Sequence, residues 1–89
     1  ERFLNKFLSD PTFGMVTDAF KAGDAQLALT ATHTFKGLTA NLGLTKLYNI
    51  SSEMVSLIRD GDYGAAAGTF PDLKAAYDEI CGILKKGLL

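Results

Sequence analysis

Residues 24–42 read DAQLALTATHTFKGLTANL, a stretch with the spacing of an amphipathic helix. At about 100° per residue, most of its large apolar side chains fall on one strip, which predicts a helix with one face against a core. The only histidine of the chain, His33, projects about 200° from Ala31 and nearly opposite this strip. We therefore expect His33 to face water. The strip consists of Ala31, Phe35, Leu38 and Leu42, with Leu27 at its edge.

The segments before this stretch are also helical in pattern. Residues 1–9 have phenylalanine and leucine at helical spacing, which predicts a short helix at the N-terminus. Asp10 and Pro11 form a helix start signal, with Asp10 expected as the N-cap and Pro11 as the first helical residue. Gly23 is expected to end that second helix, and Asp24 to cap the helix that carries His33.

Two further helices are predicted in the second half of the chain. One runs from about 44 to 59 and is followed by Gly61. The other is capped by Asp62 and reaches residue 84, with a kink or break expected at Pro71. The apolar strip of the first of these two helices consists of Leu44, Leu47, Ser51, Met54 and Ile58, with Ile50 and Leu57 alongside.

Connections of two to four residues favour antiparallel packing of successive helices. The sequence therefore predicts an all-α fold, an antiparallel up-down-up-down four-helix bundle with a short additional N-terminal helix, in a single domain over residues 1–89. A repeat of αα-hairpins is the main competitor, but no internal period supports it.

The composition narrows the function classes. The chain has 47% hydrophobic residues, 21% charged residues and a net charge of −1, which does not favour nucleic-acid binding. No apolar run is long enough for a membrane span, and the single cysteine, Cys81, rules out an internal disulfide and fits a reducing compartment. A cytoplasmic location is expected. With one histidine, neither a metal site nor another cofactor is expected.

His33 has neighbours suited to reaction at an exposed imidazole. An imidazole in water is mostly neutral near pH 7, so one ring nitrogen keeps a free lone pair and can act as a nucleophile. Gly37, one turn later, removes a side chain that would crowd the ring, and Ala40 is a second small residue on the same outer face. Lys36 is suited to contact a phosphoryl oxygen. From the residues alone, an ordinary solvated surface lysine is an equally good interpretation. Leu29 is expected on the outer face, either as an isolated leucine or as the edge of a docking patch.

The run of residues 33–44, HTFKGLTANLGL, resembles the signature of histidine-containing phosphotransfer (HPt) domains. In that family the histidine is followed by Ser or Thr, an apolar residue, Lys, Gly, several small residues and an apolar-Gly pair. The similarity extends over residues 25–62, and the flanking segments agree only in helical character.

The resemblance implies that His33 accepts a phosphoryl group from an aspartate of a receiver domain and passes it to another receiver, without kinase activity of its own. The implied partners are receivers of response regulators or of a hybrid histidine kinase, and the chain is expected to be a monomer. Mg²⁺ for the reaction belongs to the receiver. Family members often place a polar residue of the third helix near the ring. Val55 stands where some members have Gln, so Ser52 or Arg59 is expected to take that place.

Two alternatives remain open at this point. The first is the phosphotransfer domain of a chemotaxis-type kinase, which an ATP-binding domain phosphorylates directly. The second is a helical interaction module that is never phosphorylated and uses the face around Leu29.

Overall fold

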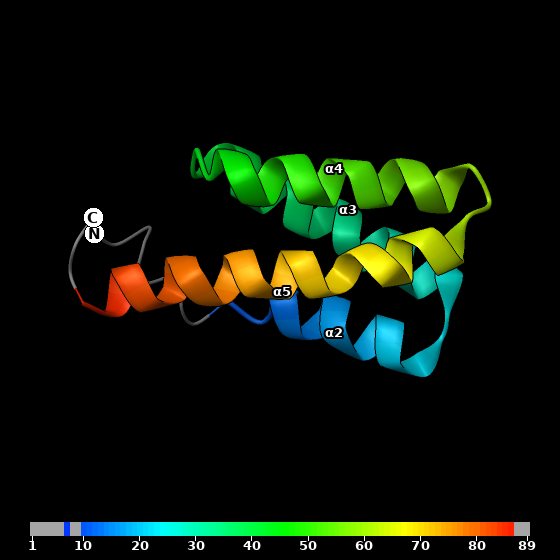
Figure 1. Cartoon of the computed structure of the whole chain (residues 1–89), viewed down its shortest axis with the longest axis horizontal. Coiled ribbons are helices and arrows are strands. Elements are labelled where there is room, and N and C mark those ends of the chain that lie inside the picture. The colour runs from blue at the N-terminus through cyan, green and yellow to red at the C-terminus, as the bar shows by residue number, and fades with distance from the viewer. Residues whose placement is uncertain (1–6, 8–9, 87–89) are drawn as a thin grey trace.

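The computed structural model describes Phe7 and residues 10–86. This part of the chain contains four α-helices and no strands, in the order α2 (Thr12–Ala22), α3 (Ala25–Asn41), α4 (Thr45–Arg59) and α5 (Tyr63–Lys85) (Figure 1). The predicted all-α class is confirmed for these residues. The helix predicted over residues 1–9 lies outside the described residues, except for Phe7, which is helical and buried.

Two of the predicted helix caps are present. The Asp24 carboxylate accepts a hydrogen bond from the backbone N–H of Leu27 at 3.0 Å. The Asp62 carboxylate does the same for Ala65 at 3.1 Å. Each bond satisfies a backbone donor in the first helical turn, which explains why α3 and α5 begin at these positions.

The start of α2 differs from the prediction by one residue. The N-cap is Pro11 and not Asp10, and the first helical residue is Thr12. Asp10 nevertheless accepts hydrogen bonds from the backbone N–H of Thr12, at 2.8 Å, and from its hydroxyl group. Because both bonds tie Asp10 to Thr12, the chain turns at Pro11 and the helix begins one residue later than expected.

Each turn between helices contains a glycine in the left-handed region. The φ angles are 69° at Gly23, 71° at Gly43 and 86° at Gly61. A side chain is strained at such angles, so these glycines allow tight turns of the chain. The helix ends predicted at Gly23 and Gly61 are therefore confirmed.

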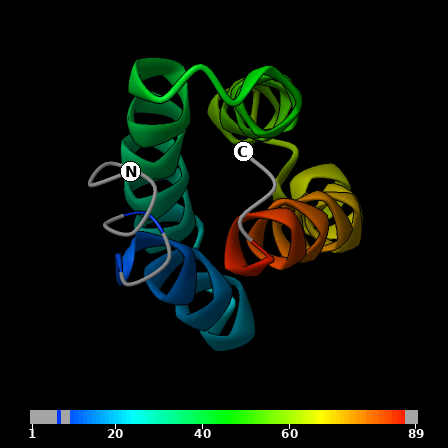
Figure 2. The same ribbon diagram turned by 90° about the vertical axis from the view of Figure 1, so that its left-hand side faces the viewer.

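The helices pack side by side in a bundle. Contacts join α2 to α3, α3 to α4 and α4 to α5. Viewed along the bundle, the four helices follow one another around it in chain order, so that α3 and α5 lie on a diagonal (Figure 2).

Aromatic rings fill the space between α2 and α5. Phe13 of α2 stacks on Tyr77 and on Phe70 of α5, with ring centroids 3.9 Å and 5.9 Å apart. Near the other end of α2, Phe20 stacks on Tyr63, whose hydroxyl donates a hydrogen bond of 3.2 Å to the carbonyl oxygen of Phe20. These contacts close the bundle between its first and last described helices.

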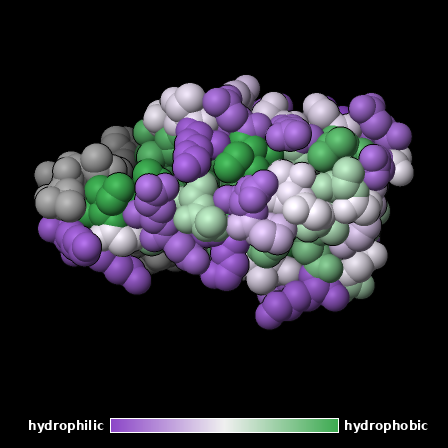
Figure 3. Space-filling model, viewed as in Figure 1, coloured by the Kyte–Doolittle hydropathy of each residue, from purple (hydrophilic) through white to green (hydrophobic). Residues whose placement is uncertain are grey.

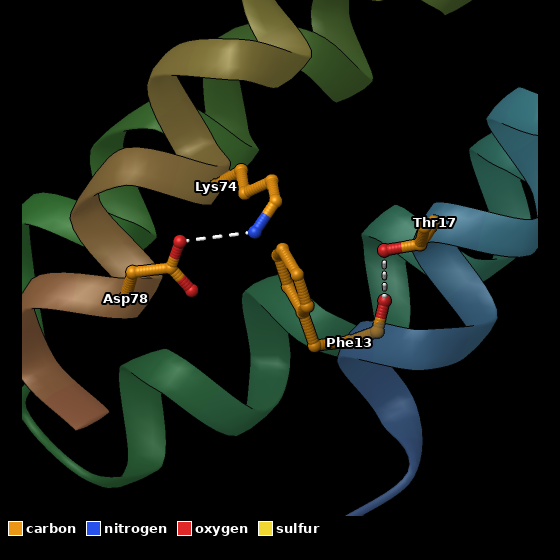
Figure 4. A network of polar contacts seen from close by, with 4 residues as sticks. All are labelled: Phe13, Thr17, Lys74 and Asp78. Atoms are coloured by element: carbon orange, nitrogen blue, oxygen red, sulfur yellow. Dashed lines mark hydrogen bonds and ion pairs between the residues drawn. The ribbon is translucent and has the colours of Figure 1, made fainter. Parts of the chain in front are cut away.

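Figure 4 shows the Phe13 ring extending from α2 toward α5. Within α2, the Thr17 hydroxyl donates a hydrogen bond of 3.1 Å to the carbonyl oxygen of Phe13. On α5, the ammonium of Lys74 pairs with the carboxylate of Asp78 at 2.9 Å. Both side chains of this pair are largely exposed, so the stacked rings contribute more to the packing of the two helices than the ion pair does.

The buried face of α3 is rotated relative to the predicted strip. Ala31 and Phe35 are buried as predicted, whereas Leu38 and Leu42 are half-buried and Leu27 is exposed. The rotation follows from the position of α4, because the face that packs against α4 must be buried whatever its polarity. The buried residues outside the predicted strip are Ala28, Thr32 and Thr39.

Helix α4 follows the predicted pattern more closely. Leu47, Ser51, Met54 and Ile58 of the predicted α4 strip are all buried. Helix α5 continues through Pro71, so the break expected there is absent. None of the described helices combines the length and the apolar character that a membrane span needs.

The surface over α4 and α5 carries many hydrophilic side chains between separate apolar patches (Figure 3). Lys46 of α4 pairs across it with Glu79 of α5, with 3.6 Å between the ammonium nitrogen and the carboxylate oxygen. Both side chains are largely exposed, so the pair adds little to stability.

Candidate functional site

His33 lies near the middle of α3 and is exposed, as predicted. The residues that α3 buries project to the opposite side of the helix, among them Phe35 and Ala28, both 0% exposed. The backbone around the ring is regular, and the hydroxyl of the adjacent Thr34 donates a hydrogen bond of 3.0 Å to the carbonyl oxygen of Thr30. The imidazole is therefore carried by a regular helix and exposed on the surface.

Gly37, one helical turn after His33, leaves open space. A Cβ atom added there would meet no atom within 4 Å, so packing does not require glycine at this position. The helical glycines Gly14, Gly68 and Gly82 are equally open. What distinguishes Gly37 is therefore its place beside His33, and not a tighter surrounding.

Lys36 reaches from α3 toward α4. Its ammonium nitrogen lies 5.8 Å from the centroid of the Tyr48 ring, within the range of a cation–π contact. The Lys36 side chain is half-buried. Neither of the two ion pairs among the described residues includes it.

A shallow pocket of about 230 Å³ lies beside this contact. Ala40, the second small residue predicted on the outer face, is exposed and lines the pocket. The pocket lies where the end of α3 meets the start of α4, and Tyr48 is among its lining residues on the α4 side. The lining residues are Thr39, Ala40, Gly43, Leu44, Thr45 and Tyr48.

Leu29 is not the exposed residue that we expected. It is half-buried and packs against the hydrophobic core. The exposed large apolar side chains of the described residues are instead Met15 of α2, 52% exposed, and Leu27 of α3, 55% exposed. The sequence pattern left Leu27 undecided because it sits at the edge of the predicted strip, where a small rotation of the helix decides its burial.

Met15 and Leu27 line the same groove between α2 and α3. The groove has a volume of about 380 Å³ and is mainly apolar. Thr30, which also lines it, precedes His33 by about one helical turn. The groove therefore lies on one flank of His33, and the Lys36–Tyr48 contact lies on the other. Its other lining residues are Asp18, Ala19, Ala22 and Ala31.

The residues expected from α4 have different environments. Ser52 is half-buried and Arg59 is exposed, while Val55 is only 1% exposed and belongs to the packed interior. The side-chain hydrogen bonds among the described residues include neither Ser52 nor Arg59. A contact from either of them to His33 remains a prediction.

Two buried hydroxyl groups, those of Thr32 and Ser51, make no hydrogen bond within the described part of the chain. They lie on the facing helices α3 and α4. Within the same part of the chain, no cluster of three or more His, Cys, Asp or Glu residues is arranged to hold a metal ion.

Comparison of the chain with models of protein families, with curated proteins and with solved structures found no match.

Proposed function

We propose that this chain is a histidine phosphotransfer protein that carries a phosphoryl group on His33 between receiver domains of a two-component phosphorelay. The observation that carries the proposal is the exposed imidazole at the middle of α3, on the side opposite the buried face. The open position at Gly37 and the cation at Lys36 support it, together with the resemblance of residues 33–44 to the HPt signature.

In the proposed step, the ring nitrogen with the free lone pair attacks the phosphorus of a phosphoaspartate on the receiver. A nitrogen–phosphorus bond forms, the acyl phosphate bond breaks, and the aspartate leaves as a carboxylate. The positive charge that develops on the imidazole is removed when the other ring nitrogen releases its proton. Transfer to the next receiver reverses these events. The chain itself acts as a carrier and not as a kinase.

The residues beside His33 have separate roles in this proposal. Gly37 leaves room for the phosphoryl group and for the active site of the receiver, which must approach in line with the ring. Lys36 offers an ammonium group to the phosphoryl oxygens, and a charge-assisted hydrogen bond of this kind is stronger than a neutral one. Glycine inside a helix lowers the stability of the helix by about 1 kcal/mol relative to alanine. In this proposal, access of the receiver to His33 offsets that loss.

The directions of the helices and the additional N-terminal helix are part of the same proposal. We expect the four helices to run up-down-up-down, with the short additional helix at residues 1–9. The two-to-three-residue turns at Gly23, Gly43 and Gly61 support alternating helix directions. Helices α4 and α5 lie alongside each other and are joined at one end (Figure 1), which also supports opposite directions for these two helices.

The receiver is proposed to rest on the groove between α2 and α3. A stable interface covers about 800 Å² on each partner, which corresponds to a disc of roughly 16 Å radius around the reacting atoms. Leu27 precedes His33 by six residues, about 9 Å along the helix axis, and projects about 120° around the helix from it, so it falls within the outer part of such a disc. A monomer in the cytoplasm remains the expected state.

The proposal is tested with the wild-type chain and His33→Gln. Phosphoramidate, a small phosphoryl donor, should label the wild type once, and a panel of radiolabelled phosphorylated receivers should include at least one that transfers its label. The label should be acid-labile and stable to base, as a nitrogen–phosphorus bond requires. His33→Gln should keep the helical spectrum, because the ring lies outside the core, and should accept no label.

Equal labelling of the two proteins would contradict the proposal. ATP and Mg²⁺ alone should give no phosphorylation, because the chain has no nucleotide-binding motif. An unphosphorylated wild type that still binds a receiver would favour the interaction module instead.

A further inference from the structure

The contact between Lys36 and Tyr48 joins the helix of the proposed nucleophile to the next helix. We propose that the Tyr48 ring holds the Lys36 ammonium at the edge of the phosphoryl site, which makes Tyr48 a positioning residue for the reaction at His33. This inference rests on the proposed function and adds to it a residue of α4 that acts through Lys36.

A lysine needs such a partner because its side chain is long and free to rotate. An unrestrained lysine loses rotamer entropy when its ammonium is held against a phosphoryl oxygen. In this structure the ammonium already lies over an aromatic face, at 5.8 Å from the ring centroid, and the side chain is half-buried. Lys36 follows His33 by three residues, so its side chain leaves α3 about 60° around the helix from the imidazole. The ring therefore restrains the cation on the flank of α3 that adjoins His33 before the phosphoryl group arrives.

Hydrogen bonds fix the relative positions of Lys36 and Tyr48. The Thr39 hydroxyl donates to the carbonyl oxygen of Lys36 at 2.9 Å. The backbone N–H of Leu44 donates to the carbonyl oxygen of Thr39 at 2.9 Å, and the N–H of Tyr48 donates to the carbonyl oxygen of Leu44 at 2.9 Å.

This chain of bonds runs from the backbone of Lys36 through the turn into the first residues of α4. Thr39, its central member, is 0% exposed. Tyr48 is thereby held at a defined position relative to α3, as positioning requires.

Tyr48 holds the Lys36 ammonium through its aromatic face and not through its hydroxyl. The side-chain hydrogen bonds among the described residues do not include the Tyr48 hydroxyl, and neither ion pair there gives Lys36 a carboxylate. Tyr48→Phe should therefore preserve the effect, whereas Tyr48→Leu should remove it. A cation–π contact at a partly exposed site corresponds to about a two- to five-fold change in an equilibrium or a rate.

The contact itself is measured without phosphorylation. In proton NMR spectra of the wild-type chain, the ε-methylene protons of Lys36 should be shifted upfield by the ring current of Tyr48. The shift should persist in Tyr48→Phe and disappear in Tyr48→Leu. A Lys36 resonance at the same position in wild type and Tyr48→Leu would overturn the proposal.

The effect on the reaction is measured as the initial rate of His33 phosphorylation by phosphoramidate. Tyr48→Leu should react about two- to five-fold more slowly than wild type, and Tyr48→Phe at the wild-type rate. In a Lys36→Ala background, Tyr48→Leu should have no further effect, because the residue then has no cation to position. Circular dichroism melting of each variant separates loss of folding from loss of positioning.

The outcomes separate the two proposals. If the ring-current shift is present but Tyr48→Leu reacts at the wild-type rate, Tyr48 is not a positioning residue although His33 is still the acceptor. An equal slowing by Tyr48→Leu with and without Lys36 would also overturn the inference, because the effect would then not act through the lysine. If wild type is not phosphorylated at His33 at all, the proposed function fails, whatever the NMR spectrum shows.

Discussion

The rings of Phe13 and Tyr77 are stacked almost parallel, with an angle of 5° between their planes and 3.9 Å between their centroids. They come from α2 and α5, the first and last described helices, and they lie at the centre of a larger aromatic cluster. Phe35 of α3 joins this cluster, with centroids 5.5 Å from Phe13 and 6.0 Å from Tyr77. The helix that carries His33 is thus held by the same rings that close the bundle.

Phe13→Ala should therefore be strongly destabilising. Removal of a buried phenylalanine side chain typically costs about 3–5 kcal/mol, because apolar burial is lost and a cavity remains. Urea unfolding, followed by circular dichroism, measures the change. Met15→Ala on the same helix is the control, since its side chain is half exposed and the expected change is within about 0.5 kcal/mol. Similar losses in the two variants would contradict the role of the stacked rings.

Tyr77 should make stability depend on pH in the alkaline range. Burial, and then the neighbouring Cys81 thiol, raise the pKa of Tyr77 to about 12. The folded state therefore keeps the phenolic proton at pH values where the unfolded chain, with a pKa of about 10, has lost it. The resulting stabilisation is complete below about pH 10 and is lost as the pH rises toward about 12.

Urea midpoints measured across this range test the pH prediction. The fall in stability should be smaller in Tyr77→Phe than in wild type, because phenylalanine has no proton to release. The other tyrosines and the lysines titrate in both proteins, so the difference between the two curves isolates Tyr77. Parallel curves would show that Tyr77 does not cause the pH dependence.

Gly37→Gln should separate stability from access to His33. Because the position is helical and open, replacing glycine should stabilise the chain by about 0.5–1 kcal/mol. The new side chain lies one turn from the imidazole and should slow transfer from a phosphorylated receiver. Gly68→Gln is the matched control, since Gly68 is equally open on α5, and it should stabilise the chain without changing the transfer rate. Transfer at the wild-type rate in Gly37→Gln would contradict the access argument.

Leu27 and Leu29 should respond differently to the same substitution. Leu29→Glu should lower the melting temperature by several degrees, because Leu29 packs against the core. Leu27→Glu should leave the melting temperature nearly unchanged and raise the apparent KM for the receiver at least several-fold, because apolar anchors in an interface commonly contribute 1 kcal/mol or more, roughly a five-fold change. Melting curves and transfer kinetics measure the two effects.

Ala75→Glu is the control for added charge, because Ala75 is exposed on α5, diagonal to α3. It should change neither quantity. An unchanged KM in Leu27→Glu would place the receiver elsewhere, while labelling of its His33 by phosphoramidate would show that the acceptor is intact.

The sequence alone was sufficient for the caps of α3 and α5, for the helix ends at Gly23 and Gly61 and for the exposure of His33. Capping by Asp24 and Asp62 and termination at glycine are local effects, set by backbone groups within a few residues. Their prediction therefore needed no knowledge of the neighbouring helices. The exposure of His33 followed as well, because it projects nearly opposite Ala31 and Phe35, the apolar residues that α3 buries, and a modest rotation of α3 does not bury it.

Only the tertiary structure decided which residues flank His33. The rotation of α3 against α4 buries Thr32 and Thr39, packs Leu29 on the core and leaves Leu27 exposed in a groove with Met15. It also brings Lys36 over Tyr48, twelve residues later in the chain. These outcomes depend on how neighbouring helices pack, and the packing is set by the sum of small differences in burial over many side chains. The periodicity of one helix predicts which of its faces is apolar, but it does not predict the angle at which the next helix packs against that face.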